Sequence, residues 1–208
     1  MLGTTTRDRR LDRRRATRAE IVEAAWELAA VDGLAGLSLR DVARRVGMQA
    51  PSLYSYFDSK NAIFDAMFAQ GAAEFLESRL ALPSTGDPLT DLRAGLHQFA
   101  RFCTENPVRY QLLFQRTIPG FELSPESFAI SVRGLQATQS QLADVGVTDP
   151  RELDLLTAIG TGLVDQQISN DPGGDRWTRL IDEAAEMFVA HVSTRDRPGQ
   201  PRKRQVRS

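Results

Sequence analysis

Hydroxyl groups gather in one short stretch of the chain, "GMQAPSLYSYFDSK", residues 47–60. Five side chains of this stretch carry a hydroxyl or phenol group, and a lysine ends it: Ser52, Tyr54, Ser55, Tyr56, Ser59 and Lys60. Such groups donate hydrogen bonds to phosphate oxygens, while short side chains reach base edges in the grooves of DNA. Arg40 adds a second cation upstream. The stretch is too polar for a core, so we expect it to face a polyanion.

The elements around this stretch predict how it is presented. Ser38-x-x-Asp41 has the pattern of a helix start, and Gly47 can take a positive φ at little cost and so end that helix in a sharp turn. Pro51 is tolerated in the first turn of a following helix, which leaves the N-terminal N–H groups of that helix open to a phosphate. This spacing predicts a helix-turn-helix unit over residues 38–57. The alternative is an ordinary three-helix core with a polar surface.

Two apolar residues of the second short helix, Leu53 and Phe57, are four positions apart and therefore share one face. We expect them to be buried. The hydroxyl-bearing residues at positions 52 and 54–56 are then left off the buried stripe.

Helical patterns continue along nearly the whole chain. A capping box at Thr17-x-x-Glu20 predicts the start of the first helix, which Gly33 ends. Ser59 is a cap for a longer helix, and later helices are expected over 89–105, 108–116, about 124–145, about 150–169 and 177–192. No stretch alternates with period two strongly enough to predict a strand. We expect an all-α fold of about nine helices.

The composition argues against several classes of protein. The single cysteine, Cys103, excludes an internal disulfide framework. There are only two histidines, and no nucleophile or metal-ligand motif such as G-x-S-x-G, CxxC or HExxH is present. A long uncharged stretch, residues 155–164, is half the ~20 residues needed to span a bilayer. We therefore expect a soluble cytoplasmic protein with no enzymatic activity, cofactor, metal or membrane contact.

Basic residues are concentrated at both ends of the chain. Residues 1–18 carry seven arginines against two aspartates, and residues 195–208 carry six basic residues against one aspartate, although the net charge is −1. Basic ends on an acidic body are compatible with contact to DNA, the N-terminal arm entering a minor groove. The alternative is that they are only disordered and solubilising, which we favour for the C-terminal tail.

Residues from about 15 to 76 resemble the DNA-binding domain of the tetracycline-repressor (TetR) family of bacterial transcription regulators. The matching segments are "IVEAAWELAAVDG", "LSLRDVARRVG" and "PSLYSYFDSKNAIFDAMF". Three residues depart from the family's usual pattern: Tyr56 replaces a frequent His, Ala29 a frequent Phe, and Gln49 a frequent Ser or Thr. These departures bear on which operator is preferred.

The resemblance implies a role for each matching residue. Five are expected near bases: Arg40, Gln49, Ala50, Pro51 and Ser52. Four are expected on phosphates: Thr17 at the start of the first helix, Tyr54, Tyr56 and Lys60. Ser55 could do either.

The resemblance also implies a division of the chain and a function. We expect a basic flexible arm over 1–15, the DNA-binding domain over 16–76, a helical effector-binding and dimerisation domain over 77–194, and a disordered tail over 195–208. The implied function is a homodimeric repressor that a small-molecule effector releases from a palindromic operator in double-stranded DNA. The alternative is a DNA-binding regulator without such a ligand, controlled by a protein partner or by abundance.

Two sets of residues in the second domain are candidates for those roles. An apolar effector would contact aromatic and neighbouring residues of the middle helices: Phe64, Phe68, Phe99, Phe102, Cys103, Tyr110, Phe114 and Phe128. The dimer interface would use the last two helices: Leu156, Ile159, Gly160, Leu163, Leu180, Ala184, Met187 and Phe188. The alternative for both sets is that they close the core of a single chain.

Overall fold

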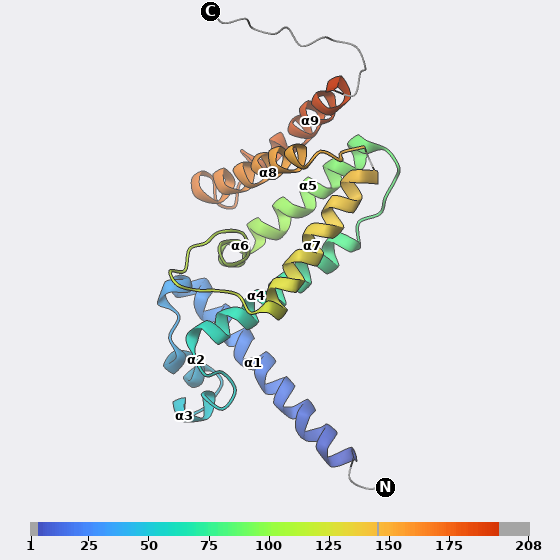
Figure 1. The fold of residues 1–208 in the computed structure, drawn as a ribbon. Helices are drawn as coiled ribbons and strands as arrows, with labels where there is room; N and C mark the ends of the chain where they lie inside the picture. The colour runs from blue at the N-terminus through green and yellow to red at the C-terminus, as the bar shows by residue number, and fades with distance from the viewer. Residues whose placement is uncertain (1–3, 145, 196–208) are drawn as a thin grey trace, which may run out of the picture. The chain divides into compact units, whose positions relative to one another are not determined.

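The computed structural model of the chain describes residues 4–144 and 146–195, and these are helical with no strand (Figure 1). The helices are α1 Thr4–Gly36, α2 Leu39–Arg45, α3 Ala50–Leu53, α4 Lys60–Leu80, α5 Pro88–Glu105, α6 Pro107–Phe114, α7 Pro125–Asp144, α8 Pro150–Asn170 and α9 Ile181–Arg195. A 3₁₀ turn, Thr178–Leu180, precedes α9. The predicted all-α fold is confirmed. The rest of the predicted C-terminal tail, residues 196–208, lies outside the described residues.

The first helix begins earlier than the sequence predicted. α1 starts at Thr4, so Thr17 lies inside the helix and is not its cap, and residues 4–15 of the expected flexible arm are helical. The physical reason is that arginine favours the helix almost as well as alanine does, and no glycine or proline interrupts residues 4–32. Gly33 breaks the helical conformation where a stop was expected, with φ at 72°.

The predicted helix-turn-helix forms as two very short helices. Between α2 and α3, Gly47 takes a φ of 69°, and the Met48 N–H donates to the Ala43 carbonyl across the turn at 2.8 Å. Pro51 stands in the first turn of α3. A helix as short as the single turn of α3 is not stable alone. The buried Leu53 side chain and the neighbouring helices therefore hold α3 in position.

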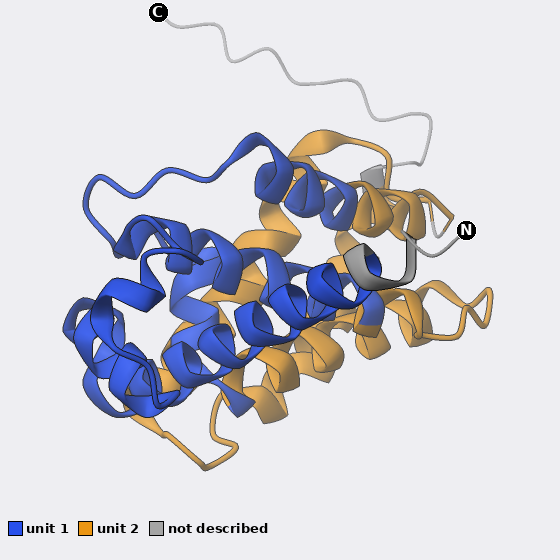
Figure 2. Cartoon of the chain, turned by 90° about the horizontal axis from the view of Figure 1, so that it is seen from below, with its two compact units in different colours: residues 1–77, 105–135 blue, residues 78–104, 136–208 orange. Residues whose placement is uncertain are grey.

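Contacts divide the chain into two compact units (Figure 2). Unit 1 comprises residues 1–77 and 105–135, and α1 packs there against α2 and α6. Its core joins apolar residues of the first four helices and of the segments between them with one from α6. The fully enclosed members are Ile21, Ala25, Ala29, Val42, Leu53, Ile63 and Met67. Leu53 and Phe57 are buried as expected.

Unit 2 comprises residues 78–104 and 136–208, and α8 packs there against α9. Its core is also apolar: Leu96, Ala100, Cys103, Leu156, Val164, Ile181, Ala185 and Phe188. The functional domain boundary at residue 76 stays a prediction, because compact units and functional domains need not coincide. Both α4 and α7 contribute residues to each unit.

The left-handed turn at Gly47 generates a stability prediction. We expect Gly47→Ala to lower the free energy of unfolding by about 1–2 kcal/mol, because an L-residue is strained at positive φ. Urea denaturation followed by circular dichroism measures it.

Gly134→Ala is the matched control, since Gly134 lies within α7 and an added methyl group meets nothing within 4 Å. It should instead stabilise the protein by about 0.5–1 kcal/mol, through helix propensity. Equal stability of Gly47→Ala and the unmodified protein would contradict the account of this turn.

Candidate nucleic-acid interface

One polar face is formed by α3 and by the turn that follows it. The exposed side chains are those of Gln49, Pro51, Ser52, Tyr54 and Ser55, whereas Ala50 is half-buried. Tyr54 has 54% of its surface exposed. Leu53, which lies between these residues in the sequence, is fully buried. One side of α3 is therefore anchored in the core, and the polar side faces solvent.

The polar side chains around α3 differ in their hydrogen bonds to the backbone. Gln49 is the N-cap by position in an extended conformation, but its side chain makes no capping hydrogen bond. Its carbonyl accepts from the Ser52 N–H at 2.9 Å. The Ser55 hydroxyl donates to the Ser52 carbonyl at 2.7 Å, so in this rotamer it can accept from a ligand but not donate to a phosphate.

Two arginines of α1 hold the turn after α3 from behind. Arg14 Nη2 donates to the Ser55 carbonyl at 2.6 Å, and Arg18 Nη1 donates to the Tyr56 carbonyl. The Arg18 guanidinium also lies 4.0 Å from the centre of the Phe57 ring, a cation–π geometry. Sequence reasoning missed this role; the signal was the i,i+4 spacing of Arg14 and Arg18, which places both on one face of a helix extended beyond its predicted start.

The two candidate tyrosines differ in their surroundings. Tyr56 is half-buried and packs against the core of unit 1, with the Arg14 guanidinium 5.1 Å from its ring centre. Tyr54 is the more exposed of the two. Tyr54 is therefore more accessible to a phosphate than Tyr56 is. The predicted phosphate contact of Tyr56 requires its hydroxyl to be exposed at the edge of the polar face formed by α3 and the turn after it.

The remaining predicted phosphate contacts, Lys60 and Thr17, have other structural surroundings. Lys60 Nζ donates to the Ala35 carbonyl at 2.9 Å, which leaves part of its three-donor capacity for a phosphate. Thr17 was predicted to bind a phosphate at the N-terminus of the first helix. It is instead half-buried inside α1, which begins at Thr4. Contacts from both residues to DNA stay predictions.

The arginines of α2 are not equivalent. Arg44 pairs with Asp41 at 2.7 Å, and Arg45 pairs with Glu27 of α1 at 2.6 Å. Arg40 is exposed at the start of the same helix. Arg40 is therefore the cation of α2 best placed to meet a polyanion.

The residues predicted for an effector pocket fall in two separate units. In unit 1, Phe64 and Phe68 belong to the core, Tyr110 lies 6.0 Å from Phe114 between ring centres, and Phe128 is exposed. In unit 2, the set consists of Phe99, Phe102 and Cys103 on α5, of which the last two are buried. Five of the eight predicted pocket residues therefore belong to unit 1, and three belong to unit 2.

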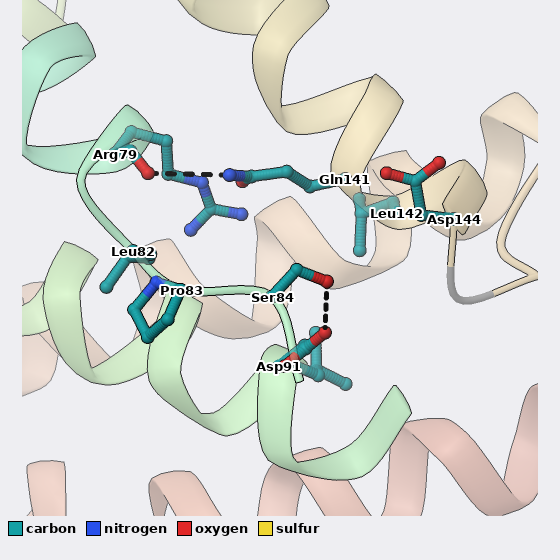
Figure 3. Close-up of a pocket in the computed structure, with 9 residues that line it drawn as sticks. Arg79, Leu82, Pro83, Ser84, Asp91, Gln141, Leu142 and Asp144 are labelled. Carbon is teal, nitrogen blue, oxygen red and sulfur yellow. Dashed lines mark hydrogen bonds between the residues drawn. The ribbon is translucent and has the colours of Figure 1, made fainter. Parts of the chain in front are cut away.

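A small cavity was not predicted from the sequence. It lies within unit 2 and has a volume of about 50 Å³ (Figure 3). Its lining comes from the ends of α4 and α7, the start of α5 and the loop before it: Arg79, Leu82, Pro83, Ser84, Asp91, Leu92, Gln141, Leu142 and Asp144. None of the eight predicted pocket residues contributes to it. Sites for drug-sized ligands are several times larger, at about 300–1,000 Å³.

No helix within the described residues is long and apolar enough to cross a membrane. The same residues contain no group of three or more His, Cys, Asp or Glu side chains placed to hold a metal ion.

Comparison with known proteins places the helix-turn-helix in a family. Residues 21–67 match the family described as bacterial regulatory proteins, tetR family. The chain is 27% identical over 132 residues to the HTH-type transcriptional regulator Rv1816 of Mycobacterium tuberculosis strain H37Rv, a match covering 62% of this chain and 56% of that protein. The chain thus spans little more than half the length of this relative.

Two solved structures share the fold. A bacterial regulatory protein in the tetR family from Rhodococcus RHA1 has a TM-score of 0.63 at 19% identity, with 84% of this chain and 96% of that chain covered. The transcriptional regulator FadR from Bacillus subtilis, in complex with stearoyl-CoA, has a TM-score of 0.62 at 15% identity, with 83% and 97% covered.

The arginine contact behind the turn generates a second prediction. Replacing Arg18 with alanine should lower the free energy of unfolding by about 1.5–3 kcal/mol, because a charge-assisted hydrogen bond and a cation–π contact are lost together. Urea denaturation monitored by circular dichroism is again suitable.

Arg15→Ala serves as the control, because the Arg15 side chain is largely exposed and its ion pair with the exposed Asp12 is long, at 4.0 Å. Its effect should stay within about 0.5 kcal/mol. Equal losses for the two variants would mean that Arg18 does not hold the turn.

Proposed function

Because the chain belongs to the bacterial regulatory proteins of the tetR family, we propose that it binds operator DNA through α3 and the turn after it. One observation carries the proposal: α3 buries Leu53 while Gln49, Ser52 and Tyr54 project outward. In this arrangement α3 enters the major groove, as recognition helices do.

Each exposed group has a chemical task in this proposal. The Gln49 amide can make paired hydrogen bonds to an adenine edge, and Ser52 can donate to or accept from a base. Pro51 and Ala50 are small and apolar enough to approach a thymine methyl group. Tyr54 donates to a phosphate, and Arg40 adds a charge-assisted contact at the groove edge.

A triple substitution of exposed residues tests the DNA interface. The unmodified protein is first used to select duplexes from a random 30-base-pair library. We then expect Gln49→Ala/Ser52→Ala/Tyr54→Phe to bind the selected duplex at least about tenfold more weakly, since a good base contact contributes about 1–3 kcal/mol. Fluorescence anisotropy at fixed salt concentration measures the affinity.

The control for this experiment is Gln139→Ala/Ser140→Ala, which removes similar exposed groups from α7. It should leave both DNA affinity and thermal stability unchanged. Failure of the unmodified protein to select any duplex, or full affinity of the triple variant, would rule out the proposed interface.

We further propose that α8 and α9 form a two-fold dimer contact. The predicted interface residues divide by burial: Leu156, Gly160 and Phe188 point into unit 2, where a Cβ on Gly160 would lie 3.4 Å from Leu96. Met187, by contrast, has 65% of its surface exposed. The contact would therefore use the outward faces of both helices, with Leu155 and Met187 at their centres and the half-buried Ile159, Leu163, Leu180 and Ala184 beside them.

Placing charges on this face tests the dimer. Leu155→Glu/Met187→Glu should convert a dimer to a monomer of about 23.1 kDa in light scattering after gel filtration, because burying two unpaired carboxylates is strongly unfavourable. Val31→Glu is the control, since Val31 is 83% exposed on α1, and it should leave the dimer intact. A dimer that survives the double change would place the interface elsewhere.

A dimer would fix the spacing of two recognition helices, and successive major-groove half-sites on one face of DNA lie about 34–36 Å apart. We propose that a small-molecule effector favours a conformer with altered spacing and so weakens repression. α4 is the candidate transmitter, because its Asp65 carboxylate accepts from the Ser124 N–H at 2.8 Å and from the Ser124 hydroxyl at 2.9 Å, just before α7. FadR, which shares the fold, was solved with stearoyl-CoA.

Catalysis is not part of the proposal. His97 and Cys103 are six positions apart on α5, about 240° around the helix axis, so they face different sides and are poorly placed as a nucleophile–base pair. A regulator without a ligand, controlled by a protein partner or by abundance, remains the second candidate for the mode of control. It predicts that no small molecule changes DNA affinity.

A further inference from the structure

A buried cation in unit 2 forms no ion pair among the described residues. Arg79, in the last turn of α4, has 9% of its surface exposed, and its Nε atom has no hydrogen-bond partner. No ion pair to its guanidinium is found within residues 4–144 and 146–195. Burying a charge without a partner is costly, and the loss of solvent lowers the pKa of Arg79.

The neighbouring helix makes room for this guanidinium. A Cβ atom at Gly95 of α5 would lie 2.5 Å from Arg79 Nη1 and 3.1 Å from Arg79 Cζ. Glycine in the middle of a helix is unfavourable, so its presence here has a local packing reason. The flat guanidinium lies against the helix where any other residue would place a side chain.

Arg79 lines the cavity of about 50 Å³, and its guanidinium lies among the other lining side chains (Figure 3). Four apolar side chains line the same space: Leu82, Pro83, Leu92 and Leu142. A space of this size holds a group of a few atoms. It therefore combines a planar cation, which suits paired hydrogen bonds to a carboxylate, with apolar walls.

The acidic residues of the lining do not neutralise Arg79. Asp91 caps the loop before α5: it accepts from the Thr85 hydroxyl at 2.6 Å, the Thr85 N–H at 2.8 Å and the Ser84 hydroxyl at 3.0 Å. The Thr85 hydroxyl, with further bonds from the same loop, lowers the pKa of Asp91, so this carboxylate is ionised and already occupied. Asp144 is exposed. Two negative groups at the cavity disfavour an anion that carries more than one charge.

We propose that this cavity binds a small monocarboxylate, whose carboxylate pairs with Arg79 and whose short aliphatic chain contacts Leu82, Leu92 and Leu142. Gln141 shares the cavity, but its side chain donates to the Arg79 carbonyl at 3.4 Å and leaves the guanidinium free. The proposal deepens the proposed function, on which it rests for one step only: the bound carboxylate is the effector that alters DNA affinity.

Binding is tested on the full chain with sodium n-butyrate as the probe. The melting temperature should rise with butyrate in a saturable way, because a ligand that binds only the native state stabilises it. n-Butyramide, which has the same shape without the charge, should cause no shift. Sodium chloride and sodium phosphate at matched ionic strength should cause none either, and a shift equal to that of butyrate from any of the three would overturn the proposal.

Two substitutions separate the charge from the fold. Arg79→Met removes an unpaired buried cation, so the ligand-free protein should melt at the same temperature or higher while losing the butyrate shift. Gly95→Ala keeps the charge but displaces the guanidinium, and should weaken butyrate binding at least about tenfold by calorimetry. Arg101→Met is the control, because Arg101 is exposed on the same helix α5 and should leave binding intact.

The two proposals fail in different ways. A butyrate shift that survives Arg79→Met, or a Gly95→Ala variant with full affinity, would overturn the carboxylate site whatever the protein does on DNA. Binding that depends on Arg79 but leaves affinity for the selected duplex unchanged would overturn the effector role alone. Absence of any DNA binding would overturn the proposed function, while the thermal shifts would still decide the site.

Discussion

The burial of Leu53 and Phe57 is the constraint on which the rest of unit 1 depends. α3 is a single turn with too few internal hydrogen bonds to persist alone, and these two side chains fix which way it faces. The left-handed turn at Gly47 brings α3 to the core, and Arg18 closes the arrangement from α1 by binding the Tyr56 carbonyl. Because Leu53 points into the core, the polar side chains of α3 and its flanking residues must point to solvent.

The two units use charged side chains differently. In unit 1, charged groups satisfy backbone carbonyls: Arg14, Arg18 and Lys60 each donate to one. Those contacts rigidify a surface whose geometry must match a duplex. In unit 2, Arg79 is buried without a partner beside a cavity. An unsatisfied cation of this kind favours a partner from outside the chain. The two proposals therefore assign different ligands to the two units: an extended polyanion to the first, and a small anion to the second.

The sequence predicted the elements well where local chemistry decides them. Gly47, Pro51 and Ser59 mark helix ends by their own conformational and hydrogen-bonding preferences, and the structure has the breaks there. Prediction failed where several local signals competed or where contacts span the chain. Thr17 has the pattern of a cap, yet the arginine-rich segment before it is itself a good helix former, so α1 starts at Thr4. The contact of Arg79 with Gly95 joins two helices, and no spacing rule along the chain reveals it.

The central claim, that α3 presents its phenol outward to a duplex, can be observed directly because the chain has only three tyrosines. All three can be replaced with 3-fluorotyrosine and followed by fluorine NMR, with the exposed Tyr54 resonance assigned through Tyr54→Phe. On addition of the selected duplex, the Tyr54 resonance should shift, whereas that of Tyr110, which is buried within unit 1, should stay in place. A Tyr54 resonance that does not move when the duplex is bound would contradict the account.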